Sequence, residues 1–307
     1  MTKEREKRNG FERPYDELQV TSWILFPVLA LYWFVGVLPC LRLLLKICLS
    51  VPFVSIFVLC AYFAFETTKT DAKDTNFTNA PSLAALPGDV KKCYICEKEV
   101  ASLTMHCRLC RKCIDGFDHH CKWLNTCIGQ KNYKAFFRTL SCATGIVVIE
   151  WCVCFWLFFA YFTQPEALSV EMSLFWGKED IELLIWFIVL CSFLFMLTPI
   201  GFLLLQLWLF HVELLRKQIT TYEYLKDLER RKREKGRVVK KHPNISSEKG
   251  AIFPMQFNDS THKSSSIYKR SILRSVFFCF TTEISNIVID HPTNINLQAN
   301  IVNRQEV

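Results

Sequence analysis

The chain has 307 residues, of which 51% are hydrophobic and 14% aromatic, and its formal net charge is +8 at pH 7. The mean hydropathy of +0.17 argues against an ordinary soluble domain and favours membrane-spanning segments. Basic residues gather at the N-terminus, around the central cysteines and after residue 215. Beside apolar spans, such charge indicates positive-inside orientation and anionic membrane lipids as partners, so we expect no nucleic-acid partner.

Two apolar runs follow the polar residues 1–20, at 21–41 and at about 47–65. Each has about the 20 residues that a helix needs to cross a hydrocarbon core of roughly 30 Å. We expect no cleaved signal peptide, because the first run is too long and lacks an A-x-A-like site. The segment 21–65 is therefore predicted to form a hairpin of two transmembrane helices.

Two more spans are predicted within 139–210, at about 139–162 and 183–210. Glu150 falls in the middle of the first of these. An intramembrane carboxyl is a candidate for function, and a protonated Glu hydrogen-bonded inside a helix bundle is the alternative.

Four spans would place both ends of the chain on one side of the membrane, and the charges predict which side. The segments 1–20, 66–138 (core 91–141) and 211–307 are rich in Lys and Arg, whereas the loop 163–182 has five acids and one base. We therefore expect the basic segments in the cytosol and the acidic loop in the lumen. The N-glycosylation sequons all fall in the cytosolic segments, so none is expected to carry sugar; they begin at Asn76, Asn244 and Asn258.

The stretch 93–136 holds seven of the fifteen cysteines and three of the seven histidines. Short C-x-x-C spacings with interleaved His are typical of metal sites rather than disulfides, and reduced thiols fit the cytosol. The stretch has few large apolar residues, so metal binding is expected to supply its folding energy. The other cysteines lie mostly in apolar runs and are interpreted as small buried hydrophobes.

Ten candidate ligands in this stretch exceed by two the eight that a pair of tetrahedral zinc sites needs. The C-x-x-C pairs at 93–96 and 107–110 are expected ligands. One thiol and one imidazole are left over near the Asp-His-His-Cys run at 118–121. A carboxylate that orients an imidazole, which in turn takes the thiol proton, would activate a nucleophile. Spacing leaves open which histidine is the ligand, and a purely structural zinc module with a spare buried thiol is the alternative.

At these residues the chain resembles the DHHC family of protein S-acyltransferases (palmitoyltransferases). The family pattern C-x2-C-x9-HC-x2-C-x2-C-x4-DHHC-x5-C-x4-N-x3-F is matched throughout 93–136, and the four-span layout is also the family's. The run 220–223 (TTYE) matches the family's TTxE motif. Lys122, where most members have Pro, resembles the small subgroup that includes the human type 1 and type 11 enzymes.

The resemblance implies two structural zinc ions and a catalytic group. The first zinc would be held by Cys93, Cys96, His106 and Cys113, and the second by Cys107, Cys110, His120 and Cys127. Cys121 would be the nucleophile, His119 its base and Asp118 the group that orients His119, with Thr221 near Asp118. The co-substrate would be palmitoyl-CoA or another long-chain acyl-CoA, and the acceptors would be membrane-proximal proteins with cytosolic cysteines, reached through an S-acyl-enzyme in a ping-pong sequence.

The sequence thus predicts an all-α polytopic membrane enzyme, with four transmembrane helices and a cytosolic two-zinc domain between helices 2 and 3. We expect it in an endomembrane, in the endoplasmic reticulum or Golgi rather than the plasma membrane. The alternative is a catalytically weak zinc-finger scaffold for signalling proteins. A zinc-bearing transporter has only Glu150 in its favour, and the basic run 226–241 is interpreted as a juxtamembrane electrostatic tether.

Overall fold

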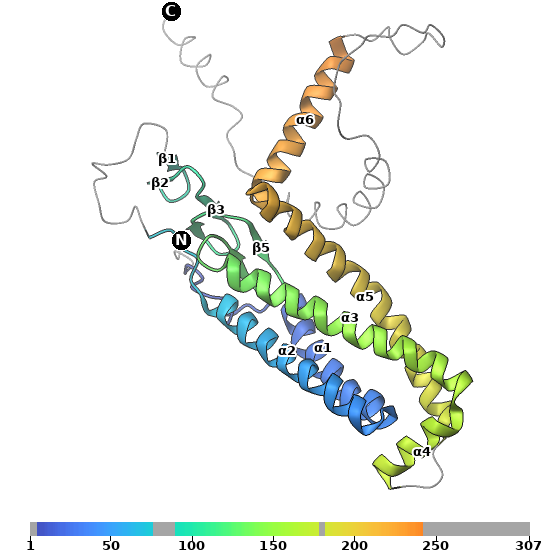
Figure 1. Ribbon diagram of the computed structural model, residues 1–307. Helices are drawn as coiled ribbons and strands as arrows, with labels where there is room; N and C mark the ends of the chain where they lie inside the picture. The colour runs from blue at the N-terminus through green and yellow to red at the C-terminus, as the bar shows by residue number, and fades with distance from the viewer. Residues whose placement is uncertain (1–4, 76–89, 178–181, 242–307) are drawn as a thin grey trace, which may run out of the picture.

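The computed structural model describes residues 5–75, 90–177 and 182–241 (Figure 1). In these ranges four helical segments are long and apolar enough to cross a membrane, which confirms the four predicted spans. They are Glu17–Cys40, Leu43–Lys69 (α2), Tyr133–Thr163 (α3) and Leu183–Lys217 (α5). The three sequons and the tail beyond residue 241 lie outside the described residues.

The first span is helical throughout but not α-helical throughout. The α-helix α1 (Glu17–Tyr32) is capped by the Asp16 carboxylate, which accepts a hydrogen bond from the Leu18 N–H at 3.0 Å. It continues through a π-helical turn, Trp33–Val37, and a 3-10 turn, Leu38–Cys40. Gly36 O, in the irregular turn, accepts a hydrogen bond from the Trp186 indole N–H of α5 at 3.0 Å. A neighbouring span thus provides a hydrogen bond to a backbone carbonyl that would otherwise have no partner in its apolar surroundings.

The α3 helix is the centre of the bundle, because both α2 and α5 pack mainly against it. The shared core is apolar and includes Trp33, Phe53, Ile146, Leu157 and Leu197. Trp33 and Phe53 stack with ring centroids 4.1 Å apart, which joins the first two spans. At the end of the bundle away from the cysteine-rich region, a short helix α4 (Pro165–Trp176) occupies part of the predicted acidic loop (Figure 1).

The cysteine-rich region between α2 and α3 consists of three antiparallel β-hairpins. They are β1 (Val90–Cys93) with β2 (Lys98–Ala101), β3 (Met105–Cys107) with β4 (Lys112–Ile114), and β5 (His119–Cys121) with β6 (Thr126–Ile128). The predicted architecture, a helical membrane protein with this region between helices 2 and 3, is confirmed. The strands are an addition to the predicted all-α description, since strands of three or four residues are too short to show a readable periodicity.

The N-terminal segment, residues 5–16, joins the cysteine-rich region to the bundle. Its Gly10 N–H donates to Thr68 O near the end of α2 at 2.9 Å, and Gly10 O accepts from the Asn125 side-chain amide at 3.2 Å. The Lys7 ammonium donates to Asn125 Oδ1 at 2.6 Å. Asn125 lies in the turn between β5 and β6, so this segment holds the third hairpin against the first two spans.

A methyl group at Gly10 is expected to displace the N-terminal segment. The added Cβ of Gly10→Ala would lie 2.1 Å from Leu124 O and 2.7 Å from Thr68 Cγ2. Relieving such an overlap costs about 1–3 kcal/mol, and thermal unfolding should show a lower Tm. Gly145→Ala is the matched control, because a Cβ at Gly145 in α3 meets nothing within 4 Å. Equal Tm values for the two variants would contradict the close packing of the N-terminal segment, residues 5–16, against the third hairpin and α2.

Candidate active site and metal centres

The three hairpins repeat one local plan. In each, a cysteine ends the first strand and a residue with positive φ (Glu97, Arg111 or Asn125) precedes the second strand. The first two hairpins have a second cysteine three positions after the first, and the third hairpin has Leu124 at that position. Cys121 is therefore the one strand-ending cysteine of the three hairpins without a C-x-x-C partner.

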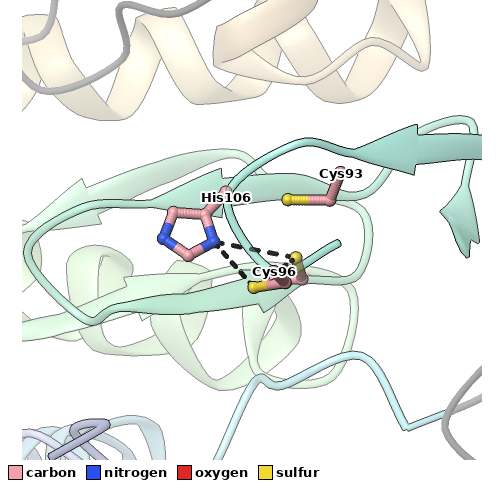
Figure 2. Close-up of side chains that lie close together, drawn as sticks. Cys93, Cys96 and His106 are labelled. Atoms are coloured by element: carbon pink, nitrogen blue, oxygen red, sulfur yellow. Dashed lines mark hydrogen bonds between the residues drawn. The ribbon is translucent and has the colours of Figure 1, made fainter. Parts of the chain in front are cut away.

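The first cluster of possible metal ligands is shared by the first and second hairpins. Cys93 and Cys96 come from the first hairpin, and His106 and Cys113 come from β3 and β4, with all four ligand atoms within 4.8 Å of one another. Figure 2 shows three of them, with Cys96 Sγ 3.2 Å from His106 Nδ1. This cluster is partly exposed.

The second cluster is shared by the second and third hairpins and is fully buried. It comprises Cys107, Cys110, His120 and Cys127, again with ligand atoms within 4.8 Å of one another. His120 Nδ1 lies 3.4 Å from Cys110 Sγ and 3.5 Å from Cys127 Sγ. Because each cluster takes residues from two hairpins, an ion in each would tie the three hairpins into one unit.

The donor chemistry of the second cluster calls for a cation. Hydrogen bonds with Cys110 and Cys127 lower the pKa of Cys107. The hydrogen bond with Cys107 in turn raises the pKa of Cys110 to about 12. Burial raises the pKa of Cys127 well above its usual value. Three thiolates cannot share this space unless a cation compensates their charge, and three thiolates with one imidazole are a typical zinc donor set. Both clusters could hold zinc.

Strand alternation separates the two adjacent histidines. Successive side chains of a strand point to opposite faces, so His119 and Cys121 share one face of β5 and His120 takes the other. His120 lies with the second cluster, and His119 lies against Asp118, with its Nδ1 2.7 Å from Asp118 Oδ2. The structure thus places the two imidazoles in different environments, which spacing alone left open.

Asp118 is buried, with 1% of its surface exposed, and three hydrogen bonds surround its carboxylate. Besides His119, the Thr221 N–H donates to Oδ1 and the Thr221 hydroxyl donates to Oδ2, both at 2.8 Å. Burial alone would raise the pKa of Asp118, but the hydrogen bond with His119, together with that from the Thr221 N–H, holds this pKa below its usual value. Thr221 begins α6 (Thr221–Lys241), so the end of the last span reaches back to the third hairpin.

His119 lies between Asp118 and Cys121. Burial would lower the pKa of His119, but hydrogen bonds with Asp118 and Cys121 outweigh it and raise this pKa to about 10. Cys121 is buried, with 7% of its surface exposed, and it packs with Phe136 and Leu140 of α3, near Leu204 of α5. Asp118, His119 and Cys121 therefore meet where the third hairpin rests on α3 and α5.

Two polar residues of the spans that were not predicted from the sequence also lie here. Tyr133, the first residue of α3, has its hydroxyl oxygen 3.2 Å from His211 Nδ1 of α5. A ring nitrogen of His211 is within 4.8 Å of ligand atoms of Asp118 and His119. The available signal was a histidine directly after the predicted span 183–210, and α5 extends past it to Lys217. An ionisable side chain in a span is uncommon unless it faces a polar interior.

Glu150 stands apart from this group. It is fully buried in α3, and its two carboxylate oxygens have no hydrogen-bond partner among the described residues. The hydrogen-bonded arrangement considered from the sequence is therefore not seen in the described part of the chain.

Fold and site together define a polytopic membrane protein with a two-cluster Cys/His module and a thiol–imidazole–carboxylate group at its membrane end. Residues 87–228 match the family model described as DHHC palmitoyltransferase, so this part of the chain is a DHHC domain.

The chain is also similar to curated relatives. It is 28% identical to the human "Palmitoyltransferase ZDHHC11" over 177 residues, which cover 52% of this chain and 42% of that protein. It is 39% identical to "Probable protein S-acyltransferase 22" of Arabidopsis thaliana over 144 residues, which cover 46% and 24% of the two chains. The similarity thus spans less than half the length of these relatives. The human relative is consistent with the subgroup that Lys122 indicated.

Proposed function

We propose that this protein is a protein S-palmitoyltransferase, which moves a long-chain acyl group from acyl-CoA to protein cysteines through an S-acyl-Cys121 intermediate. The observation that carries the proposal is the order Asp118–His119–Cys121, with a buried carboxylate on one side of the imidazole and a thiol on the other. This order supports a base that accepts the thiol proton and a carboxylate that stabilises the resulting imidazolium.

In the proposed first step, His119 takes the proton of the Cys121 thiol, and the thiolate attacks the carbonyl carbon of the acyl-CoA thioester. The C–S bond to CoA breaks, and the CoA thiolate leaves with the proton from His119. Asp118 holds the ring through Nδ1, and Thr221 fixes Asp118 through two hydrogen bonds. Positioning of this kind removes much of the entropic cost of bringing the groups together.

In the proposed second step, the thiol of an acceptor cysteine gives its proton to His119 and attacks the acyl-enzyme. The bond between the acyl group and Cys121 breaks, and the Cys121 sulfur regains a proton. Both steps exchange one thioester for another, so they are nearly balanced in free energy. The apolar ends of α3 and α5 beside Cys121 suit an acyl chain, whose burial is worth about 0.8 kcal/mol per CH₂.

We further propose that the two clusters hold structural zinc ions, one on Cys93, Cys96, His106 and Cys113 and one on Cys107, Cys110, His120 and Cys127. Bound zinc would supply folding free energy to three hairpins that have little core of their own. The ion of the second cluster would hold His120, and so would fix the strand that carries His119 and Cys121.

The proposed orientation places this chemistry in the cytosol. The N-terminal segment, the hairpins and the start of α6 contact one another, while α4 lies at the other end of the bundle (Figure 1). Together with the charge distribution, this supports cytosolic termini, a lumenal 163–182 loop and the division into the segments predicted from the sequence. An endomembrane location and membrane-proximal acceptor proteins are part of this proposal.

Labelling with an alkynyl fatty acid tests the proposed function. Cells expressing the wild-type chain should carry label that hydroxylamine removes, and Cys121→Ala should carry almost none. Cys152→Ala is the matched control, because Cys152 is an exposed cysteine of α3 away from both clusters, and its label should equal that of the wild type. Equal labelling of wild type and Cys121→Ala would show that Cys121 is not the nucleophile, and it would favour the scaffold alternative.

A further inference from the structure

His211 brings a second imidazole to the proposed catalytic group from the last span. It lies in α5, and only 2% of its surface is exposed. Its Nδ1 is 3.2 Å from the Tyr133 hydroxyl oxygen, and a ring nitrogen lies within 4.8 Å of ligand atoms of Asp118 and His119. A buried polar side chain in a membrane span is costly unless its surroundings are arranged for it.

Three rings pack around this point. The His119 and His211 centroids are 5.9 Å apart, and Phe136 meets each of them edge-on at 5.1 Å with an interplanar angle of 70°. The ring of His119 thus contacts Phe136 and His211 as well as the Asp118 carboxylate. Such packing leaves little freedom to rotate the ring away from Cys121.

We propose that Tyr133 and His211 form a positioning unit that holds the Asp118–His119 pair in the orientation needed to deprotonate Cys121. In the arrangement we propose, His211 is neutral with its ring proton on Nε2, so that its Nδ1 accepts the hydrogen bond from the Tyr133 hydroxyl. A neutral ring packs against His119 without adding a second positive charge beside the imidazole that must accept a proton. The inference rests on the proposed function for its meaning in acyl transfer, but its geometry can be tested separately.

Three variants of the purified, zinc-loaded protein test the unit: Tyr133→Phe, His211→Phe and the double variant. Each single change is expected to slow acylation of Cys121 by palmitoyl-CoA by about 10- to 100-fold, since small misplacement of reacting groups has effects of this order. The double variant should be no slower than His211→Phe, because residues that act as a unit are not additive. Tyr62→Phe is the control, because Tyr62 is an exposed tyrosine of α2, and its rate should equal that of the wild type.

Alkylation of Cys121 by iodoacetamide, mapped by mass spectrometry, separates this inference from the proposed function. If the wild type forms no acyl-enzyme, the proposed function fails, yet slower alkylation in the variants would still support the positioning unit. The inference is overturned if folded variants react at wild-type rates, or if the two single effects multiply in the double variant. A third zinc equivalent in the wild type that His211→Phe loses would also overturn it, by assigning Asp118, His119 and His211 to a metal site.

Discussion

Replacing Cys127 by serine is expected to abolish acyl-enzyme formation and to release zinc from the second cluster. Cys127 is fully buried, and it pairs in register with His120, so it links the cluster to the strand that carries Cys121. Structural zinc contributes about 10–16 kcal/mol in small zinc-dependent domains, which is as large as the whole stability of an ordinary domain. Loss of one thiolate should therefore disorder the third hairpin and displace Cys121.

The measurements for this variant are zinc content and hydroxylamine-sensitive labelling. We expect less than two zinc ions per chain and no label above background. Cys152→Ser is the matched control, because Cys152 is outside both clusters and a helical serine can bond to its own helix, as Ser141 does with Phe137 O. A Cys127→Ser protein with two zinc ions and full labelling would show that this cluster does not hold the site together.

The second large effect is expected for Asp118→Asn, which should lower the rate of acylation by about 10³- to 10⁴-fold while zinc content is retained. An amide keeps the size of the side chain but no longer stabilises the imidazolium, and loss of the carboxylate in the serine-protease arrangement costs about 10⁴-fold. The rate is measured in a single turnover with palmitoyl-CoA.

Thr221→Val provides the graded comparison for this prediction. It removes the hydroxyl donor to Asp118 Oδ2 but leaves the Thr221 N–H bond to Oδ1, so its loss should be much smaller than that of Asp118→Asn. A loss in Thr221→Val as large as that in Asp118→Asn would show that Asp118 acts mainly through fold rather than through charge.

Much of the architecture could be predicted from the sequence because its signals are local. Hydropathy over about 20 residues locates each span, and the C-x-x-C spacings locate the metal-binding region. The same counting isolated one thiol and one imidazole, but could not choose between His119 and His120. That choice depends on the two faces of a three-residue strand, and a strand so short shows no pattern of its own.

The remaining parts of the site depend on contacts between distant segments. Thr221 and His211 reach Asp118 only because α5 returns the chain to the third hairpin. The family resemblance implied the place of Thr221, but nothing in the sequence linked His211 to Asp118. The N-terminal segment looked like an ordinary polar end, yet Gly10 and Lys7 bond to the turn after Cys121 through Asn125. Local composition carries no information on such long-range hydrogen bonds.

The proposed mechanism makes Cys121 the one residue that carries the acyl group between donor and acceptor. The most direct test is to mix purified protein with palmitoyl-CoA, map the acylated peptide by mass spectrometry, and then add a thiol-containing acceptor peptide in the absence of acyl-CoA. We expect a hydroxylamine-sensitive adduct on Cys121, absent from Cys121→Ala, which disappears as the acceptor peptide becomes acylated. An adduct confined to other cysteines, or one on Cys121 that the acceptor never removes, would contradict the proposed mechanism.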